Sequence, residues 1–192
     1  PDIEAPIYSN MIVTPPSPST YSTTQTYEFN ISWQDNVAVD NVIFEFDGTN
    51  YTATCNPSLP SNVTTCSISL NALSAGNHSY RWYANDTSNN WNSTTLANYE
   101  IQKANPVENL HIAINGTEAD QSFAYGNVTN VTAWSDLPDN QDLIFNLYRN
   151  GQLVGSGASV SDVGLMGAGT YIYEYNTSGG ENYTSASITR QL

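Results

Sequence analysis

The feature that most restricts the fold of this 192-residue chain is a short alternation of apolar and polar residues that recurs without any helical period. Segments 27–33, 42–46 and 80–84 each place aromatic and aliphatic residues at every second position. Such alternation puts one side of a β-strand into a core and the other into solvent. Turns rich in Gly, Asn, Asp and Pro separate the segments about every 8–12 residues, which is typical of β-sandwiches. The sequence therefore predicts an all-β protein.

The second half of the chain repeats landmarks of the first half, which predicts two copies of one module. The matched landmarks are Trp33-Gln34-Asp35 with Trp134-Ser135-Asp136, Ile43-Phe44 with Ile144-Phe145, and Ala75-Gly76 with Ala168-Gly169. The first two pairs are 101 residues apart and the third is 93 apart, so the first module is longer between them. The extra residues are expected in the Cys55–Cys66 segment. Pro106 marks a short, stiff linker, which predicts domains at 1–103 and 104–192.

The N-terminal arm, from Pro1 to Thr20, holds five prolines and one strand-like run, Ile7–Thr14. The prolines favour an extended backbone. One hypothesis makes Ile7–Thr14 the first strand of its own sandwich. The other adds part of the arm to an open sheet edge of the next subunit. Such an addition would give head-to-tail self-association into a filament.

Several stretches of the chain resemble immunoglobulin-like (fibronectin type III-like) modules of bacterial and archaeal cell-surface proteins. In the first half these stretches are Asp35–Phe44, Asp47-Gly48, Ala75–Asp86 and Asn90-Trp91. In the second half, which resembles a companion module of archaeal surface proteins, they are Asn115–Thr117, Leu147–Gly151, Gly169–Tyr173 and Asn182–Thr184. The resemblance implies two tandem immunoglobulin-like β-sandwich domains and an exported location. It implies no activity, because such modules serve many roles. Ala38 stands where these modules often have Gly.

The chain has eleven N-x-S/T sequons, none with Pro in the middle position. Its 24 Asn and 41 Ser plus Thr would give about five by chance, so the excess is about twofold. N-linked glycans attach to exposed Asn of proteins that cross a membrane, and the excess predicts an extracellular glycoprotein. The alternative is an Asn- and Thr-rich β-protein that collects sequons by composition. The sequon asparagines are Asn30, Asn50, Asn62, Asn77, Asn85, Asn92, Asn115, Asn127, Asn130, Asn176 and Asn182.

The two cysteines, Cys55 and Cys66, flank a segment that contains Pro57 and Pro60. This arrangement suits two antiparallel strands joined by a long turn. In an exported protein such a pair is oxidised by default, so we expect a disulfide that stabilises the first domain by about 3 kcal/mol. The alternatives are two free thiols or a metal site, and no Cys or His cluster supports the metal site.

The charge balance excludes several classes of partner. Lys and Arg number 4 against 18 Asp and Glu, a net charge of −14. Such a surface repels nucleic acid and anionic lipid. No apolar run reaches the 18 residues of a membrane span, and no signal peptide is recognisable. The chain thus reads as a processed protein or as a piece of a longer one, without membrane insertion.

Residues that could carry chemistry are few, and no catalytic site is predicted. His78 and His111 lack metal-ligand spacing and are expected to be ordinary strand residues. No phosphate loop or nucleophile elbow is present. Loop carboxylates could bind Ca²⁺ but also cap turns, so no metal site or other cofactor is assigned. These carboxylates are Asp35, Asp40, Asp47, Asp136, Asp139 and Asp142.

The chain has 13 Tyr and 4 Trp, and packing in the two cores explains most of these aromatic residues. Those expected outside the cores are Tyr51, Tyr83, Trp91, Tyr125 and Tyr183. They could bury against a neighbouring subunit or stack on sugars.

These features favour a non-enzymatic, N-glycosylated extracellular structural protein: a subunit of a surface filament, pilus or surface layer, or a stalk segment. A carbohydrate-binding or adhesive module, or an accessory region of a secreted hydrolase, are the alternatives.

Overall fold

The computed structural model describes residues 2–139 and 141–192, and within them the chain is almost entirely β-strand. It divides into two compact units, residues 1–102 (domain 1) and 103–192 (domain 2). The division falls one residue from the boundary expected from the sequence. No helix in the described ranges is long and apolar enough to cross a membrane.

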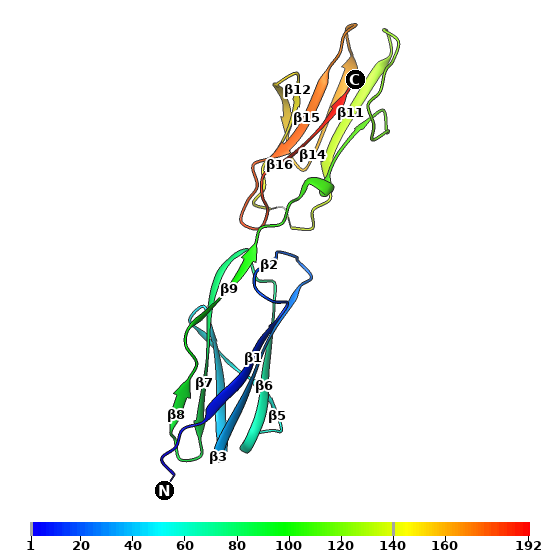
Figure 1. Cartoon of the computed structure of the whole chain (residues 1–192). Helices are drawn as coiled ribbons and strands as arrows, with labels where there is room; N and C mark the ends of the chain where they lie inside the picture. Colours follow the sequence, from blue (N-terminus) through cyan, green and yellow to red (C-terminus); the bar gives the residue numbers. More distant parts are fainter. Residues whose placement is uncertain (1, 140) are drawn as a thin grey trace. The chain divides into compact units, whose positions relative to one another are not determined.

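Domain 1 is a sandwich whose two layers share one long strand (Figure 1). Its strands are β1 (Ile7–Thr14), β2 (Ser19–Thr20), β3 (Thr26–Phe46), β4 (Thr49–Thr52), β5 (Thr54–Asn56), β6 (Ser61–Asn71), β7 (Gly76–Asp86), β8 (Trp91–Ser93) and β9 (Ala97–Gln102). The first half of β3 pairs with β1 and β6, and its second half pairs with β4 and β7. The register shifts between Gln34 and Asn41, where β3 passes from one layer to the other.

Domain 2 repeats this order of strands with two separate sheets. It contains the short 3-10 helix η1 (Val107–Asn109) and strands β10 (Leu110–Ile114), β11 (Val128–Ser135), β12 (Phe145–Arg149), β13 (Gln152–Ser156), β14 (Ser159–Leu165), β15 (Ile172–Thr177) and β16 (Ala186–Gln191). The sheet β10-β11-β14 corresponds to β1-β3-β6, and the sheet β13-β12-β15-β16 corresponds to β4-β3-β7-β9. The fold is therefore two tandem immunoglobulin-like sandwiches, as the resemblance implies, and the all-β prediction from the alternation is confirmed.

The core of domain 1 is aromatic. Tyr27, Phe29, Ile31 and Trp33 alternate along β3 and are fully buried. Phe29 packs against Phe44 with ring centroids 4.8 Å apart. Ring pairs at such distances add to the stabilisation from buried area alone. The core of domain 2 has fewer rings and relies on aliphatic residues of β10, β11 and β12 with Tyr173 and Tyr175 of β15.

The hairpin turns are formed by residues that tolerate positive φ. Asn150 and Gly151, between β12 and β13, have φ values of 50° and 77°. Asp47 and Gly48, between β3 and β4, have 46° and 77°. These are the two positive φ values that a type I′ turn requires.

Two of the sequence landmarks do not occupy equivalent places. Trp33 is fully buried, whereas Trp134 is partly exposed and alternates with the buried Ala133. Phe44 pairs with Trp82, and the matching pair in domain 2 is Leu147 with Tyr175. Phe145 therefore lies two residues out of register with Phe44. The repeat holds for the order of strands and fails at single residues. A slip of one residue puts Trp134 on the opposite face from Trp33, whereas the slip of two residues keeps Phe145 on the buried face.

The longer stretch of domain 1 lies between β4 and β6. There the chain forms the extra strand β5, which pairs with β6 and carries Cys55. In domain 2, β13 and β14 are separated only by residues 157 and 158. The extra residues therefore fall in the segment that the sequence indicates.

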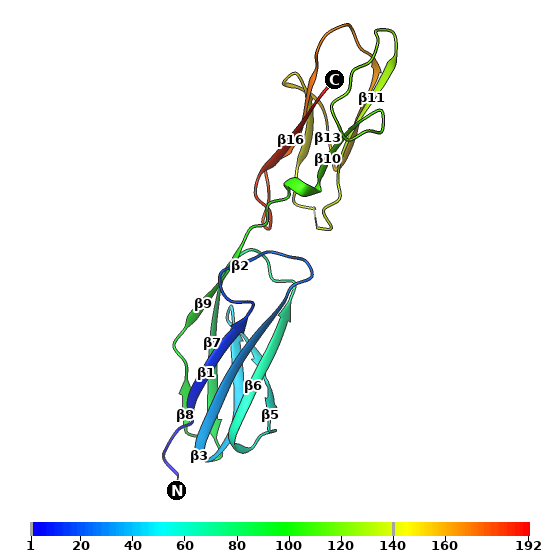
Figure 2. The ribbon, with the colours of Figure 1, turned by 45° about the vertical axis from the view of Figure 1, so that its right-hand side comes forward.

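The N-terminal arm belongs to its own domain. β1 pairs antiparallel with β3, from Ile7 opposite Gln34 to Thr14 opposite Glu28, and β2 pairs with β9. Figure 2 shows β1 lying along β3. The first of the two hypotheses is thus confirmed, and donation of this strand to a neighbouring subunit is wrong for this fold. Self-association through another surface stays a proposal.

Candidate functional sites

Nine of the eleven sequon asparagines are exposed or half-buried. The exposed ones are Asn50, Asn62, Asn77, Asn115, Asn127 and Asn130, and the half-buried ones are Asn30, Asn92 and Asn176. Strand alternation explains this for Asn130, which lies on β11 between the buried Thr129 and Val131. A glycan at these positions has solvent to extend into, so they remain predicted attachment sites.

Two sequons are enclosed. Asn85, near the end of β7, is 7% exposed and Asn182 is 8% exposed. The side-chain nitrogen of Asn182, the atom that would carry a sugar, lies 3.3 Å from a carboxylate oxygen of Asp139. The expectation that nearly all sequons lie on polar faces therefore does not hold for this pair. Glycans at Asn85 and Asn182 would have to be attached before the domain that contains each residue folds.

Cys55 and Cys66 form a disulfide. They lie directly opposite each other in the β5–β6 pairing. Cys66 is fully buried, whereas β5 is a three-residue edge strand. The bond therefore attaches a short edge strand to the interior of domain 1.

The two histidines lie on strands and contact carboxylates. His78 on β7 has Nδ1 2.7 Å from Asp47 Oδ2 and Nε2 2.9 Å from the Ser74 carbonyl oxygen. His111 on β10 has Nδ1 3.0 Å from Glu118 and stacks on Trp134. The contacts of His78 with Asp47 and of His111 with Glu118 are not predicted by the spacing of these residues in the sequence. Neither ring has a hydrogen-bonded nucleophile among the described residues, so neither forms a catalytic triad there.

Most of the carboxylates considered for Ca²⁺ have protein partners. Asp47 accepts hydrogen bonds from Ser79, and Asp136 accepts one from Asn109 that lowers its pKa. Asp142 accepts one from the backbone of Glu181. Asp40 is exposed. Of the set, Asp35 alone joins a group of carboxylates close enough to share a metal ion, and its partners are Asp2 and Asp86. Neither partner is among the loop carboxylates expected from the sequence.

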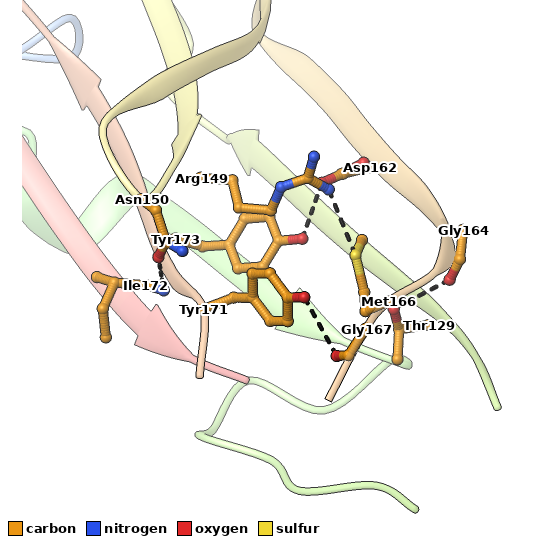
Figure 3. A network of polar contacts seen from close by, with 10 residues as sticks. All are labelled: Thr129, Arg149, Asn150, Asp162, Gly164, Met166, Gly167, Tyr171, Ile172 and Tyr173. Atoms are coloured by element: carbon orange, nitrogen blue, oxygen red, sulfur yellow. Dashed lines mark hydrogen bonds and ion pairs between the residues drawn. The ribbon is translucent and has the colours of Figure 1, made fainter. Parts of the chain in front are cut away.

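Arg149, Asp162 and Tyr173 form a polar network across the two sheets of domain 2 (Figure 3). Arg149 on β12 and Tyr173 on β15 each donate a hydrogen bond to Asp162 Oδ2 on β14. Both bonds are 2.8 Å long. Burial and then the bond to Asp162 raise the pKa of Tyr173 to about 12. Burial alone raises the pKa of Tyr175 to about 12. The network ties three strands together and has no reactive group.

Of the five aromatic residues expected outside the cores, two are exposed, two are half-buried and one is buried. Trp91 is 49% exposed and Tyr125 is 74% exposed. Tyr51 is half-buried, and Tyr83 donates a 2.6 Å hydrogen bond to Glu45. Tyr183 is buried at 6% exposure, which corrects the expectation for that residue.

A surface cavity of about 240 Å³ lies in domain 2, where Phe123, Tyr125 and Tyr171 contribute to its lining. The Tyr171 hydroxyl donates to the Gly167 carbonyl oxygen, which also lines the cavity. Aromatic rings beside polar backbone groups are the usual features of a small-ligand site.

Comparison with known proteins gives neighbours in fold only. No family model matches the chain, and no curated protein matches it. The fibronectin(III)-like modules of Clostridium thermocellum CbhA align with 11% identity and a TM-score of 0.33, over 96% of this chain and 92% of that one. Dimeric latent PorU from Porphyromonas gingivalis aligns with 15% identity and a TM-score of 0.40, over 98% of this chain and 20% of that one. Likenesses this distant carry no argument about function.

Proposed function

We propose that this chain is a non-enzymatic, N-glycosylated structural component of a cell surface, such as a filament or surface-layer subunit or a stalk segment. The observation that carries the proposal is the distribution of the sequons. Nine of the eleven asparagines are exposed or half-buried, and they occur in both domains. A surface with few charged side chains and many sequons is suited to solvation by sugars.

Three further observations support the proposal. The disulfide attaches an edge strand of domain 1, and such bonds persist in oxidising compartments. The net charge of −14 disfavours nucleic acid and anionic membranes as partners. Arg149 and His78 each bond to a carboxylate of their own domain, which is compatible with a structural role.

Mass measurement tests the glycoprotein claim. Protein purified from its native source should lose mass on chemical deglycosylation, and its peptides from residues 1–192 should be heavier than their sequence masses by whole glycans. The same residues expressed in bacteria, where they are unglycosylated, are the matched control. Native peptides with the same masses as those of the control would contradict the proposal.

A second candidate function is carbohydrate binding, and the cavity beside Phe123 and Tyr125 favours it. Exposed aromatic rings stack on sugar faces. If the cavity binds glycans, Tyr125→Ala should abolish binding on a glycan array. Trp91→Ala, which removes another exposed ring in domain 1, should leave binding intact. No binding by the unaltered chain would eliminate this candidate.

A further inference from the structure

Three carboxylates from separate parts of domain 1 converge at one end of the sandwich. Asp2 comes from the N-terminal segment, Asp35 from the bend of β3, and Asp86 from the end of β7. One oxygen of each lies within 4.8 Å of the corresponding oxygens of the other two. Asp35 is 5% exposed and Asp86 is 1% exposed. Figures 1 and 2 show the N-terminal segment beside β8, at the end of the sandwich where β3 bends and β7 ends.

Hydrogen bonds fix the orientation of the two buried carboxylates. Asp35 Oδ1 accepts from the backbone N–H groups of Val37, at 3.0 Å, and Ala38, at 2.8 Å. Asp86 accepts two hydrogen bonds of 2.7 Å from Asn90, one from the backbone N–H of Asn90 and one from its side-chain amide. The site therefore holds two carboxylates in fixed positions.

The N-terminal segment is held against this site. Asp2 Oδ1 accepts two hydrogen bonds of 3.1 Å, one from the backbone N–H of Glu4 and one from the side-chain amide of Asn36. The side-chain amide of Asn90 also donates to the backbone oxygens of Asp2 and Glu4. Asp2 is thus brought to Asp35 and Asp86 by specific contacts.

Two oxygens at this site have no donor among the described residues. Asp35 Oδ2 and Asp2 Oδ2 are enclosed and form no hydrogen bond with any of these residues. Within residues 2–139 and 141–192, no Lys, Arg or His forms an ion pair with any of the three carboxylates. Enclosed carboxylate oxygens without a donor are costly, and like charges this close repel each other. A positive charge between the three side chains would remove both costs.

We propose that Asp2, Asp35 and Asp86 bind a hard divalent cation of the Ca²⁺ type. Ca²⁺ takes six to eight oxygen ligands at about 2.3–2.6 Å, so ligands on opposite sides of the ion are about 5 Å apart. The three oxygens already lie within that span. One oxygen from each carboxylate leaves the remaining positions to water. The ion joins the N-terminal segment to the β3 bend and to the end of β7.

Calorimetric titration of the chelator-treated full chain with Ca²⁺, and separately with Mg²⁺, tests the site. Binding of one ion per chain is expected, with a dissociation constant on the order of 10⁻⁴ to 10⁻³ M for an extracellular module. Asp35→Asn and Asp2→Asn should each weaken binding at least roughly tenfold. Asp40→Asn, which alters an exposed carboxylate outside the cluster, should leave binding unchanged.

Two further readouts keep the test independent of folding defects. Ca²⁺ should raise the thermal unfolding temperature of domain 1 alone and protect residues 2–6 from an aminopeptidase or from hydrogen exchange. Asp2→Asn changes a terminal side chain outside the core, so this variant should fold normally and lose both effects. The proposal is overturned if neither ion binds. Equal binding by Asp35→Asn and by the unaltered chain would also overturn it, because binding would then reflect the net negative charge alone.

Discussion

Reduction of the Cys55–Cys66 disulfide should destabilise domain 1 and leave domain 2 unchanged. The bond closes a loop with a sequence separation of 11. On the chain-entropy estimate, a loop of this length contributes about 3 kcal/mol. For a domain of about 100 residues, each kcal/mol moves the unfolding temperature by about 4–8 °C, so a fall of roughly 12–24 °C is expected.

The structure gives a further reason for this effect. β5 contributes only three residue pairs to its ladder with β6. Without the bond, so short an edge strand has little to hold it, and it should become accessible to proteases before the rest of the domain.

Differential scanning calorimetry of oxidised and reduced protein provides the assay, with the domain 2 transition as an internal reference. The variant Cys55→Ser with Cys66→Ala separates loss of the bond from the presence of free thiols, since Cys66 is fully buried. A change below about 1 kcal/mol would refute the loop-closure argument. A parallel fall of both transitions would refute the independence of the two domains.

Three other outcomes follow from the described side chains. Asp162→Asn removes a charged acceptor shared by two donors in domain 2, and should lower its free energy of unfolding by about 1–3 kcal/mol, measured by urea denaturation. Folding raises the pKa values of Tyr173 and Tyr175 from 10.0 to about 12. Their contribution to the free energy of unfolding is therefore complete below pH 10 and is lost as the pH rises through 12. The domain 2 transition should fall over that window, and Phe substitutions at both positions should flatten the fall. Glycopeptide mapping of native protein should find lower occupancy at Asn85 and Asn182 than at the nine accessible sequons; equal occupancy at all eleven would show that attachment precedes folding.

Local patterns predicted the strands and turns well. The alternation along β3 follows directly from one face being buried, and Asn150-Gly151 forms its turn because both residues tolerate positive φ. The Cys55–Cys66 pairing follows from two strands that face each other across a long turn. Each of these features is set by residues close together in the sequence.

Features that depend on side-chain direction were harder to predict. Trp134 matches Trp33 in sequence context, yet it lies on the opposite face of its strand because the repeat slips by one residue. Tyr183 reads as a loop residue but is buried. Burial of Asn85 likewise depends on neighbours from elsewhere in the chain.

The carboxylate cluster could not be predicted from spacing. Asp2, Asp35 and Asp86 are separated by more than thirty residues at each step, and only the pairing of β1 with β3 and of β3 with β7 brings them together. Sequence reasoning included Asp35 as a Ca²⁺ candidate, but it grouped that residue with its neighbours along the chain. Contacts between distant segments require the fold first.

Imaging of the native material tests the central claim most directly. Cells or envelopes of the source organism, labelled with gold-conjugated antibody against this chain, should show label on a polymer, lattice or stalk at the cell surface in negative-stain electron microscopy. Envelopes treated to strip surface structures should lose the label. Label confined to the cell interior, or only on dispersed single particles in the medium, would contradict a structural role at the surface.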